Sequence, residues 1–394
     1  MVTENEALEN GAATEGKSKK SWKSLSKGQK AVRITAITAG GLVGLFILTV
    51  IIYLLYVVCG YYRLEDNIVL DISNNNSVAV SIDGEHTVMT YNVGFGAYSP
   101  EYTFFMDTGT MKDGTPTQGK YGTAISKADV EKNIKGSSGV IKEHSPDFAI
   151  IQEVDYDSTR SYRVDQRVAF AGISGYASTF AINYHSSYLF YPFNDPHGKN
   201  NAGIMTLSKY KVADSTRYSF PIAEDFSKFT DLDRCFAITH VPVDNGKTLS
   251  IISLHMSAYD EGGVIRKQQA ELLKSVLEEE YKKGNYVIAG GDFNQDLIEN
   301  LEKFTSNQKV PGWISSYDKN DIPEHFAIVA DKNSEVGSCR GADVVWERGK
   351  DYTCVIDGFI VSDNVEVVSV QIIDTDFAYS DHNPVELTFK FLAA

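Results

Sequence analysis

Several short apolar stretches of this chain carry an acid, an amide or a histidine at one end. These polar residues are Asn92 in HTVMTYN, Glu153 in DFAIIQE, His255 in LSIISLH, Asp292 and Asn294 in YVIAGGDFN, Asp357 in TCVID, and Asp381 and His382 ahead of NPVELTFKF. Oxygen ligands predominate in this set, which suits Mg²⁺, Mn²⁺ or Ca²⁺ better than zinc. Since Mg²⁺ commonly binds a substrate phosphate as well, a hard cation beside two histidines indicates phosphoester hydrolysis.

The apolar stretches are typical of β-strands, because they are short and rich in Val, Ile, Tyr and Phe. Two longer amphipathic stretches, 126–144 and 264–284, are predicted to be helices. If the last strand runs antiparallel to most others, its beginning lies at the edge where they end, and the polar residues meet at one rim. A single polar residue at a strand end could mark only the point where the strand meets water. The prediction therefore depends on the similar chemistry of all these polar residues.

The same segments resemble the endonuclease/exonuclease/phosphatase superfamily, in order and in motif. They are TYNVGFG, IIQEVD, SLHMS, GGDFNQD, VIDGFIVS and YSDHNPVELTF, between about His86 and Phe391. The superfamily includes deoxyribonuclease I-like nucleases, apurinic endonucleases, neutral sphingomyelinases and inositol polyphosphate 5-phosphatases. The resemblance implies an α/β fold, a four-layer sandwich of two packed mixed β-sheets flanked by helices.

The resemblance also implies a metal site. Glu153 is the expected ligand, with Asn92 beside it and Asp381 close by. Mg²⁺ is the expected ion, and Mn²⁺ or Ca²⁺ would suit the same oxygen ligands.

Five residues are assigned to catalysis by chemistry and by likeness to the family. Asp292 is expected to orient or activate the attacking water, and Asn294 to hold that water or the phosphate. His382, oriented by Asp357, is expected to contact the phosphoryl oxygens or to act as a base. His255 is expected to stabilise developing charge or to protonate the leaving oxygen. The sequence leaves open which histidine is the acid and which is the base.

Two glycines, Gly290 and Gly291, directly precede this catalytic motif. We expect them to let the backbone approach the scissile phosphate, since they carry no side chains. The stretch GTPTQGKY at 114–121 is similar to a phosphate-binding loop, but Tyr121 replaces the required Ser or Thr, so that alternative is rejected.

Substrate contacts are expected from two places. Asn201 ends an aromatic-rich stretch, 184–201, which we interpret as a core strand; if its aromatics are exposed instead, they could stack on bases or enter a lipid surface. Arg234 is a second candidate phosphate contact, with pairing to Asp231 or Asp233 as the alternative.

An apolar segment near the N-terminus predicts a membrane anchor. Residues 34–62 carry no charged side chain and are long enough to cross a bilayer as one transmembrane helix. Residues 1–33 hold seven Lys and Arg against four Glu, so we expect them to form a disordered cytoplasmic tail. The rest would then be extracytoplasmic, with 63–85 as a juxtamembrane linker and 86–394 as the catalytic domain. Gly40 and Gly44 could support weak helix–helix dimerisation.

The net charge of the chain argues against one class of substrate. The chain has 37 basic and 52 acidic residues; without the seven and four of the tail, residues 34–394 carry 30 against 48, a charge of −18. A body this acidic is a poor general binder of duplex nucleic acid.

Cys339 and Cys354 could pair outside the cell or could both be buried thiols.

These observations predict an anchored, single-pass plasma-membrane phosphoesterase that uses Mg²⁺ on a lipid or small phosphodiester. An extracellular nuclease is the alternative with the same chemistry. A catalytically silent binding or receptor module is the alternative of another class.

Overall fold

The computed structural model describes residues 21–258 and 260–392. The chain divides into two units, Met1–Tyr56 and Val57–Ala394. A single turn, η1 (Trp22–Ser24), precedes the apolar helix α1 (Lys27–Gly60), which by length and composition could cross a membrane. The helix begins earlier than position 34, so part of the predicted tail is helical. Residues 1–20 of that tail lie outside the described residues.

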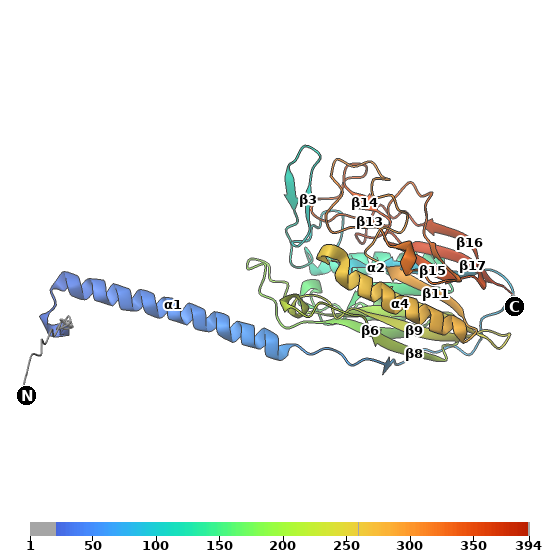
Figure 1. The fold of residues 1–394 in the computed structure, drawn as a ribbon, viewed down its shortest axis with the longest axis horizontal. Coiled ribbons are helices and arrows are strands. Elements are labelled where there is room, and N and C mark those ends of the chain that lie inside the picture. The colour runs from blue at the N-terminus through green and yellow to red at the C-terminus, as the bar shows by residue number, and fades with distance from the viewer. Residues whose placement is uncertain (1–20, 259, 393–394) are drawn as a thin grey trace, which may run out of the picture. The chain divides into compact units, whose positions relative to one another are not determined.

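Two large mixed sheets form the centre of the second unit (Figure 1). The seven-stranded sheet has the order β1-β8-β9-β10-β11-β15-β12, and the six-stranded sheet has the order β16-β17-β2-β5-β7-β6. The strands of the first are β1 (Ile68–Val69), β8 (Asp214–Ser219), β9 (Cys235–Pro242), β10 (Thr248–His255), β11 (Tyr286–Asp292), β15 (Asp357–Ser362) and β12 (Phe326–Val329). Those of the second are β16 (Val365–Ile372), β17 (Val385–Phe391), β2 (His86–Asn92), β5 (Phe148–Asp155), β7 (Asn201–Ser208) and β6 (Ala177–His185).

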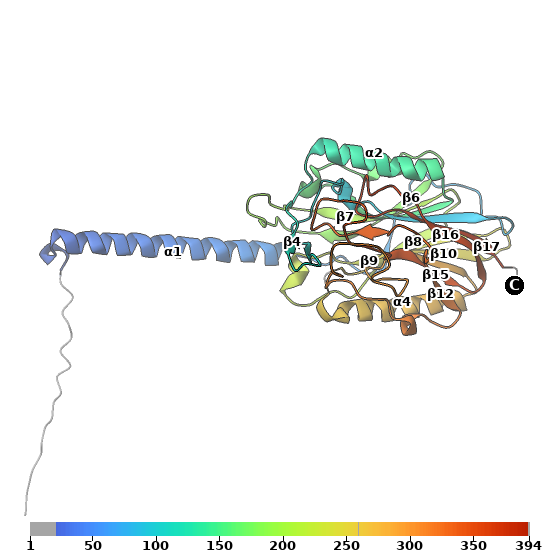
Figure 2. The ribbon, with the colours of Figure 1, turned by 90° about the horizontal axis from the view of Figure 1, so that it is seen from above.

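Helices cover the outer faces of the two sheets. Figure 2 shows α2 (Lys127–His144) on one side of the strands and α4 (Val264–Lys282) on the other, which confirms the four-layer α/β sandwich. Both predicted helices are therefore present, and Ser126 caps α2 by accepting a hydrogen bond from the backbone of Asp129. The remaining elements are short: α3 (Arg167–Ala171), η2 (Gly94–Gly96), η3 (Thr159–Ser161), η4 (Phe226–Phe229), η5 (Glu261–Gly263), η6 (Lys319–Asp321), and the ribbons β3 (Thr108–Thr110) with β4 (Pro116–Gln118) and β13 (Cys339–Arg340) with β14 (Thr353–Cys354).

The strands alternate between two apolar layers. In β2, Val88 belongs to the buried cluster shared by the two sheets, whereas Met89 and Tyr91 belong to the cluster beneath α2. Ile150 and Ile151 of β5 divide in the same way. Because successive side chains of a strand point to opposite faces, every second residue of these strands faces the space between the sheets.

The segment 63–85 is not a free linker, which corrects the prediction. Its strand β1 pairs with β8, and Ser73 bridges to Ser178 of β6. Val80 is fully buried and bridges to Val243. These contacts make the segment part of the globular unit.

The stretch 184–201 is not a continuous core strand either. Tyr184 is buried near the end of β6, but the chain then forms a loop over 186–200. Phe190, Tyr191 and Phe193 of this loop are exposed. The strand interpretation is therefore wrong beyond His185.

Cys339 and Cys354 occupy directly opposed positions in the ribbon of β13 and β14, and both are buried free thiols. The structure therefore favours two buried thiols over a disulfide between Cys339 and Cys354.

The two glycines of β11 are required by the packing of neighbouring strands. A Cβ on Gly290 would meet the ring of Phe359 on the neighbouring strand. Gly291 has φ 153° and its Cβ would collide with the carbonyl oxygen of Leu254 on β10. The bare backbone lets β11 fit between its neighbours, and the approach of a phosphate to these glycines stays a prediction.

Replacing Gly291 with alanine should therefore destabilise the sheet. We expect Gly291→Ala to lower the free energy of unfolding by about 3 kcal/mol, since the new methyl group must push β10 away from β11. Urea unfolding of the detergent-solubilised chain measures this loss. Gly139→Ala on α2, where nothing lies within 4 Å of an added Cβ, is the control and should be neutral or stabilising. Equal stability of the two variants would contradict the packing role.

Candidate active site

The predicted polar residues lie at one edge of the two packed sheets. In the six-stranded sheet, β2 and β5 run parallel and β17 runs antiparallel to β2, so the prediction for the last strand is confirmed. In the other sheet, β10 and β11 run parallel, and β15 runs antiparallel to β11. Asp357 therefore begins β15 and does not end a strand, and it pairs in register with Asp292 at the end of β11.

Strand alternation directs these residues into the space between the sheets. Asn92 lies two and four residues after Thr90 and Val88, on the face of β2 that turns toward the other sheet. Asp292 has the same relation to Gly290 and Ile288 on β11. The two residues meet across the sheets, where the amide nitrogen of Asn92 donates to Oδ2 of Asp292 at 3.0 Å.

Glu153 reaches the same place through an irregularity of β5. The register of β5 against β7 shifts between Ile151 and Val154, and Glu153 has φ 57°. Such a bulge re-aims a side chain that regular alternation would turn away. Gln152 bonds to Thr90 within the sheet, while Oε1 of Glu153 accepts from Asn92 at 3.3 Å.

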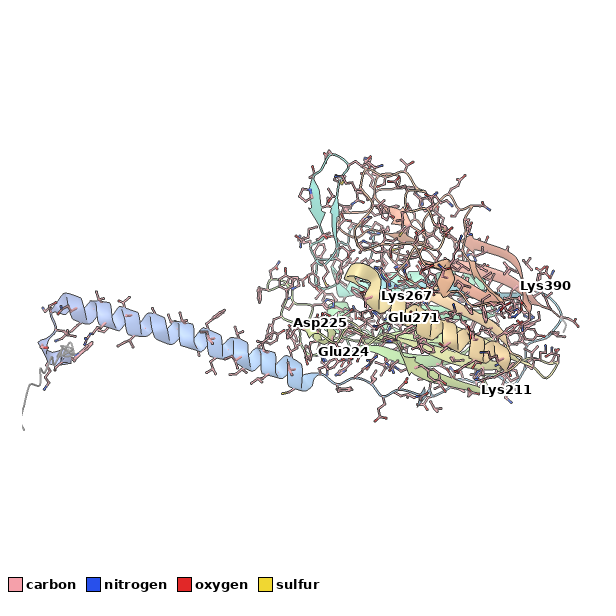
Figure 3. The ribbon with its side chains drawn as sticks, viewed as in Figure 1. Lys211, Glu224, Asp225, Lys267, Glu271 and Lys390 are labelled. Carbon is pink, nitrogen blue, oxygen red and sulfur yellow. The ribbon has the colours of Figure 1, made fainter. Side chains whose placement is uncertain are left out.

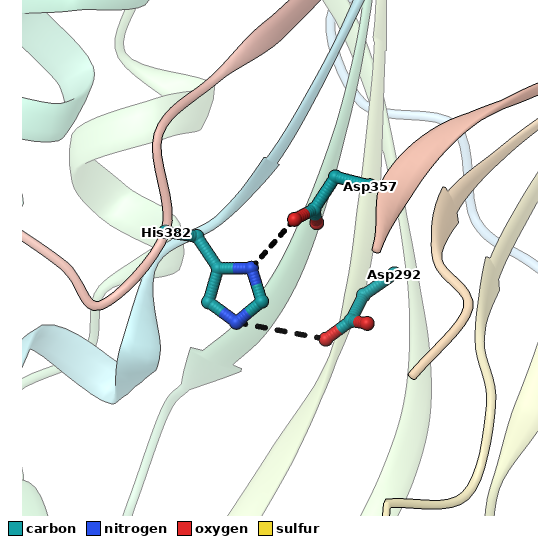
Figure 4. A group of neighbouring side chains, drawn as sticks. All are labelled: Asp292, Asp357 and His382. Atoms are coloured by element: carbon teal, nitrogen blue, oxygen red, sulfur yellow. Dashed lines mark hydrogen bonds and ion pairs between the residues drawn. The ribbon is translucent and has the colours of Figure 1, made fainter. Parts of the chain in front are cut away.

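His382 lies between two aspartates (Figure 4). Its Nδ1 is 2.8 Å from Oδ2 of Asp357, and its Nε2 is 3.7 Å from Oδ2 of Asp292. The hydroxyl of Ser338 donates to the same oxygen of Asp357 at 2.8 Å. The imidazole is therefore held by Asp357, as the sequence predicted. Its second nitrogen faces Asp292.

His255 approaches the same oxygen of Asp292 as His382 does. Its Nε2 is 3.5 Å from Oδ2 of Asp292, and its buried Nδ1 has no hydrogen-bond partner among the described residues. Asn294 donates its backbone N–H to Oδ1 of Asp292 and its side-chain amide to the carbonyl of Met256. Asp292 thus forms the centre of the cluster.

Burial and neighbouring charges shift the pKa values of these groups in opposite directions. Burial raises the pKa of Asp292 to about 7, against the favourable charge of His382. Burial also lowers the pKa of His255 well below its usual range, and Arg234 adds to this effect. The pKa of His382 is raised, because Asp357 and other nearby acids outweigh the burial that opposes its charge. His255 is therefore neutral and His382 cationic near neutral pH.

The oxygen-rich part of the cluster fits a hard divalent cation. Burial raises the pKa of both Glu153 and Asp381, so these carboxylates lack sufficient positive charge nearby. Asn92 bonds to Glu153, and Asp381 raises the pKa of Glu153 by its charge, so the three predicted ligands are neighbours. With the amide of Asn92 turned, all three would offer oxygen atoms.

A second group of possible ligands fits a metal less well. Ligand atoms of Asp292, Asp357 and His382 lie within 4.8 Å of one another. Because the pKa of His382 is raised and its Nδ1 already bonds to Asp357, its imidazole is poorly suited to bind a cation.

The two predicted substrate contacts differ in their surroundings. Arg234 is buried, donates to the carbonyl of Met256 at 2.8 Å and to Asp231 at 3.4 Å, and leaves its Nε without a partner among the described residues. Asn201 begins β7 at the same edge of the sheet, but its side chain bonds to His185 and to the carbonyl of Asp157. A substrate contact by either residue remains a prediction.

Sequence reasoning missed Arg160. Its guanidinium forms two hydrogen bonds with Asp155, at 3.0 and 2.8 Å, and lies 3.9 Å from the ring centre of Phe95. Its charge lowers the pKa of Glu153, against the effect of burial. The only signal in the sequence is a basic residue seven positions after Glu153.

Comparisons with known proteins agree with this geometry. The family model described as Endonuclease/Exonuclease/phosphatase family matches residues 89–382. The chain is similar to the crystal structure of an endonuclease/exonuclease/phosphatase from Beutenbergia cavernae, at 16% identity and TM-score 0.53, covering 79% of this chain and 73% of that one. It is also similar to the protein of that family from Bacteroides vulgatus, at 16% identity and TM-score 0.50, covering 78% and 100%.

A third similar structure is ANGEL2, a 2',3'-cyclic phosphatase in complex with adenosine-2',3'-vanadate, at 13% identity and TM-score 0.50, covering 84% of this chain and 100% of that one. No curated protein sequence matches the chain. At these identities the structures show the fold, and the family model covers most of the chain. The chain therefore belongs to the endonuclease/exonuclease/phosphatase family, whose members are metal-dependent phosphoester hydrolases.

Proposed function

We propose that this chain is a membrane-anchored, extracytoplasmic phosphodiesterase that uses Mg²⁺ to direct water onto a lipid or small phosphodiester. The observation that carries the proposal is the meeting of Asn92, Asp292, His255 and His382 at one buried edge between the sheets. Oxygen ligands, a carboxylate of raised pKa and two histidines in different protonation states are the groups that phosphoester hydrolysis needs.

The residues divide the chemistry among them. A cation held by Glu153, Asn92 and Asp381 would neutralise charge on the phosphoryl oxygens. Asp292, with Oδ1 fixed by the backbone N–H of Asn294, is placed to orient a water and accept its proton. The cationic His382 is placed to donate from Nε2 to a phosphoryl oxygen.

His255 supplies a neutral imidazole whose Nε2 also faces Oδ2 of Asp292. Its unpartnered Nδ1 and the unpartnered Nε of Arg234 are buried polar atoms, and a bound phosphodiester would satisfy them. These assignments give His382 the role of donor and leave His255 to polarise the ester.

Two features favour a lipid or small phosphodiester as substrate. Residues 34–394 carry a formal charge of −18 from 30 basic and 48 acidic residues, which opposes broad binding of duplex DNA. The apolar helix α1 would hold the enzyme at a bilayer. A nuclease is the second candidate, because ANGEL2, whose fold is similar, is a 2',3'-cyclic phosphatase whose structure holds an adenosine derivative.

Removal of the metal or of Asp292 should abolish turnover. We expect a chelator and Asp292→Asn each to reduce hydrolysis of bis(p-nitrophenyl) phosphate at least about 100-fold, with Mg²⁺ restoring only the chelated wild type. Asp363→Asn on the surface is the matched control and should keep full activity. Activity that resists both treatments would contradict the mechanism. An inactive wild type on sphingomyelin, inositol phosphates, RNA and plasmid DNA alike would support a silent binding module.

The contact between Asp357 and His382 should affect kcat more than KM. Asp357→Asn keeps the volume but removes the charge that stabilises the imidazolium, so we expect kcat to fall about 1,000-fold while KM changes little. Ser338→Ala, which removes one hydrogen bond to Asp357, should cost about tenfold or less. Steady-state kinetics separate the two constants. An Asp357→Asn variant no slower than Ser338→Ala would refute the positioning role.

The proposed topology predicts protease sensitivity from outside the cell. If residues 1–33 stay in the cytoplasm, protease added to intact cells should remove an epitope placed at the C-terminus and leave an N-terminal one. Immunoblotting of both epitopes tests this, with permeabilised cells as the control. Protection of the C-terminal epitope in intact cells would overturn the extracytoplasmic location.

A further inference from the structure

The second unit holds the chain tightly at the point where α1 ends. The hydroxyl of Tyr61 donates to Oδ1 of Asp233 at 3.1 Å. The ring of Tyr62 packs on that of His185, with 4.5 Å between the ring centres. Arg63 then donates to the carbonyl of Phe220.

All three partners belong to the catalytic edge. His185 ends β6, and β6 runs parallel to β5 because both are antiparallel to β7. Asp233 shortly precedes β9, whose beginning pairs with the end of β10, where His255 lies. Phe220 directly follows β8, whose end pairs with the same beginning of β9. The chain thus enters the second unit at the edge that carries the active-site residues.

Exposed aromatic side chains lie beside this entry point. We use the name aromatic rim for Phe190, Tyr191, Phe193 and Phe226, which are 49%, 59%, 84% and 56% exposed. The first three lie on the 186–200 loop, which begins next to His185. Phe226 packs on Phe229, and Phe229 packs on Tyr61, each with 5.2 Å between ring centres. Phe226 is therefore joined to the juxtamembrane segment through Phe229, and the loop that carries the other three rings follows His185, which packs on Tyr62.

The charges around the rim favour an aromatic contact over an electrostatic one. Glu224 and Asp225 directly precede Phe226, and Figure 3 places them at the opposite end of the strands from Lys390. Lys228 lies over the rings of Tyr61 and Phe229. A nucleic acid or an anionic lipid would meet these acids, whereas the headgroup region of a zwitterionic bilayer accepts aromatic rings with few basic residues.

We propose that the aromatic rim lies in the headgroup region of the bilayer that holds α1, so that the catalytic edge faces the membrane. The proposal rests on the membrane anchoring of the proposed function and extends it to the direction from which the substrate comes. A phosphodiester headgroup at the bilayer surface then reaches Asp292 and His382 without leaving the membrane. An active site at the opposite edge would require a substrate that diffuses from solution.

Quenching by brominated lipids tests this orientation. The full-length chain carrying Phe193→Trp is reconstituted into phosphatidylcholine vesicles, with and without brominated acyl chains. Two matched variants are measured in parallel: Ile47→Trp in the middle of α1, and Val368→Trp, which is 40% exposed on β16. The wild-type signal of Trp22, Trp313 and Trp346 is subtracted.

We expect strong quenching at position 47, clear quenching at position 193 and little at position 368. The quenching at 193 should persist at about 0.5 M NaCl, because screening does not weaken an apolar contact. It should also persist in Asp292→Asn, so a failure of catalysis would leave this result unchanged.

Three outcomes would overturn the proposal. If the tryptophan at position 47 is quenched but the one at position 193 is quenched no more than the one at position 368, the chain is anchored and its aromatic rim stays in water. Absence of quenching at position 47 would contradict the membrane anchoring on which the proposal rests. Quenching of the Phe193→Trp variant by a single-stranded oligonucleotide, in place of the brominated lipid, would assign the rim to base stacking.

Discussion

The structure depends on holding several carboxylates together in a space from which water is largely excluded. Asp292, Asp357, Asp381 and Glu153 lie at the same edge, and like charges this close in a low-dielectric space repel one another. The fold counters the repulsion with the imidazolium of His382 and with amide and hydroxyl donors. A divalent cation would relieve the rest, which explains why such a cluster suits a metal-dependent enzyme.

Both sheets must keep their positions for this cluster to exist. The hydrogen bond from Asn92 to Asp292 joins the end of one sheet to the end of the other. The glycines of β11 allow the strand to fit closely between β10 and β15, which fixes the position of Asp292. Positive φ angles at Glu153 and Asn294 turn those side chains in directions that regular strand geometry does not provide. Two residues that face the site therefore depend on an irregular backbone.

The path of the chain brings the segment after α1 to the edge that carries the site residues. The segment after α1 does not lead loosely into the globular unit but is bound by side chains next to the strands that carry the site. The segment 63–85 then continues along both sheets. These contacts fix residues 61–63 on the second unit, which a flexible linker would not do.

The sequence by itself determined the family, the four-layer fold, the two long helices and the polar residues that meet at the edge. The family and the four-layer fold follow from the resemblance that motifs such as Gly-Asp-Phe-Asn and Ser-Asp-His-x-Pro carry in consecutive residues, and strand alternation is a local rule. Only the tertiary structure decided that Gly290 and Gly291 serve packing, that 63–85 belongs to the sheets, and that Arg160 lies near Glu153. Each of these three features depends on which distant segment of the chain packs beside the residue. No local sequence pattern identifies that segment.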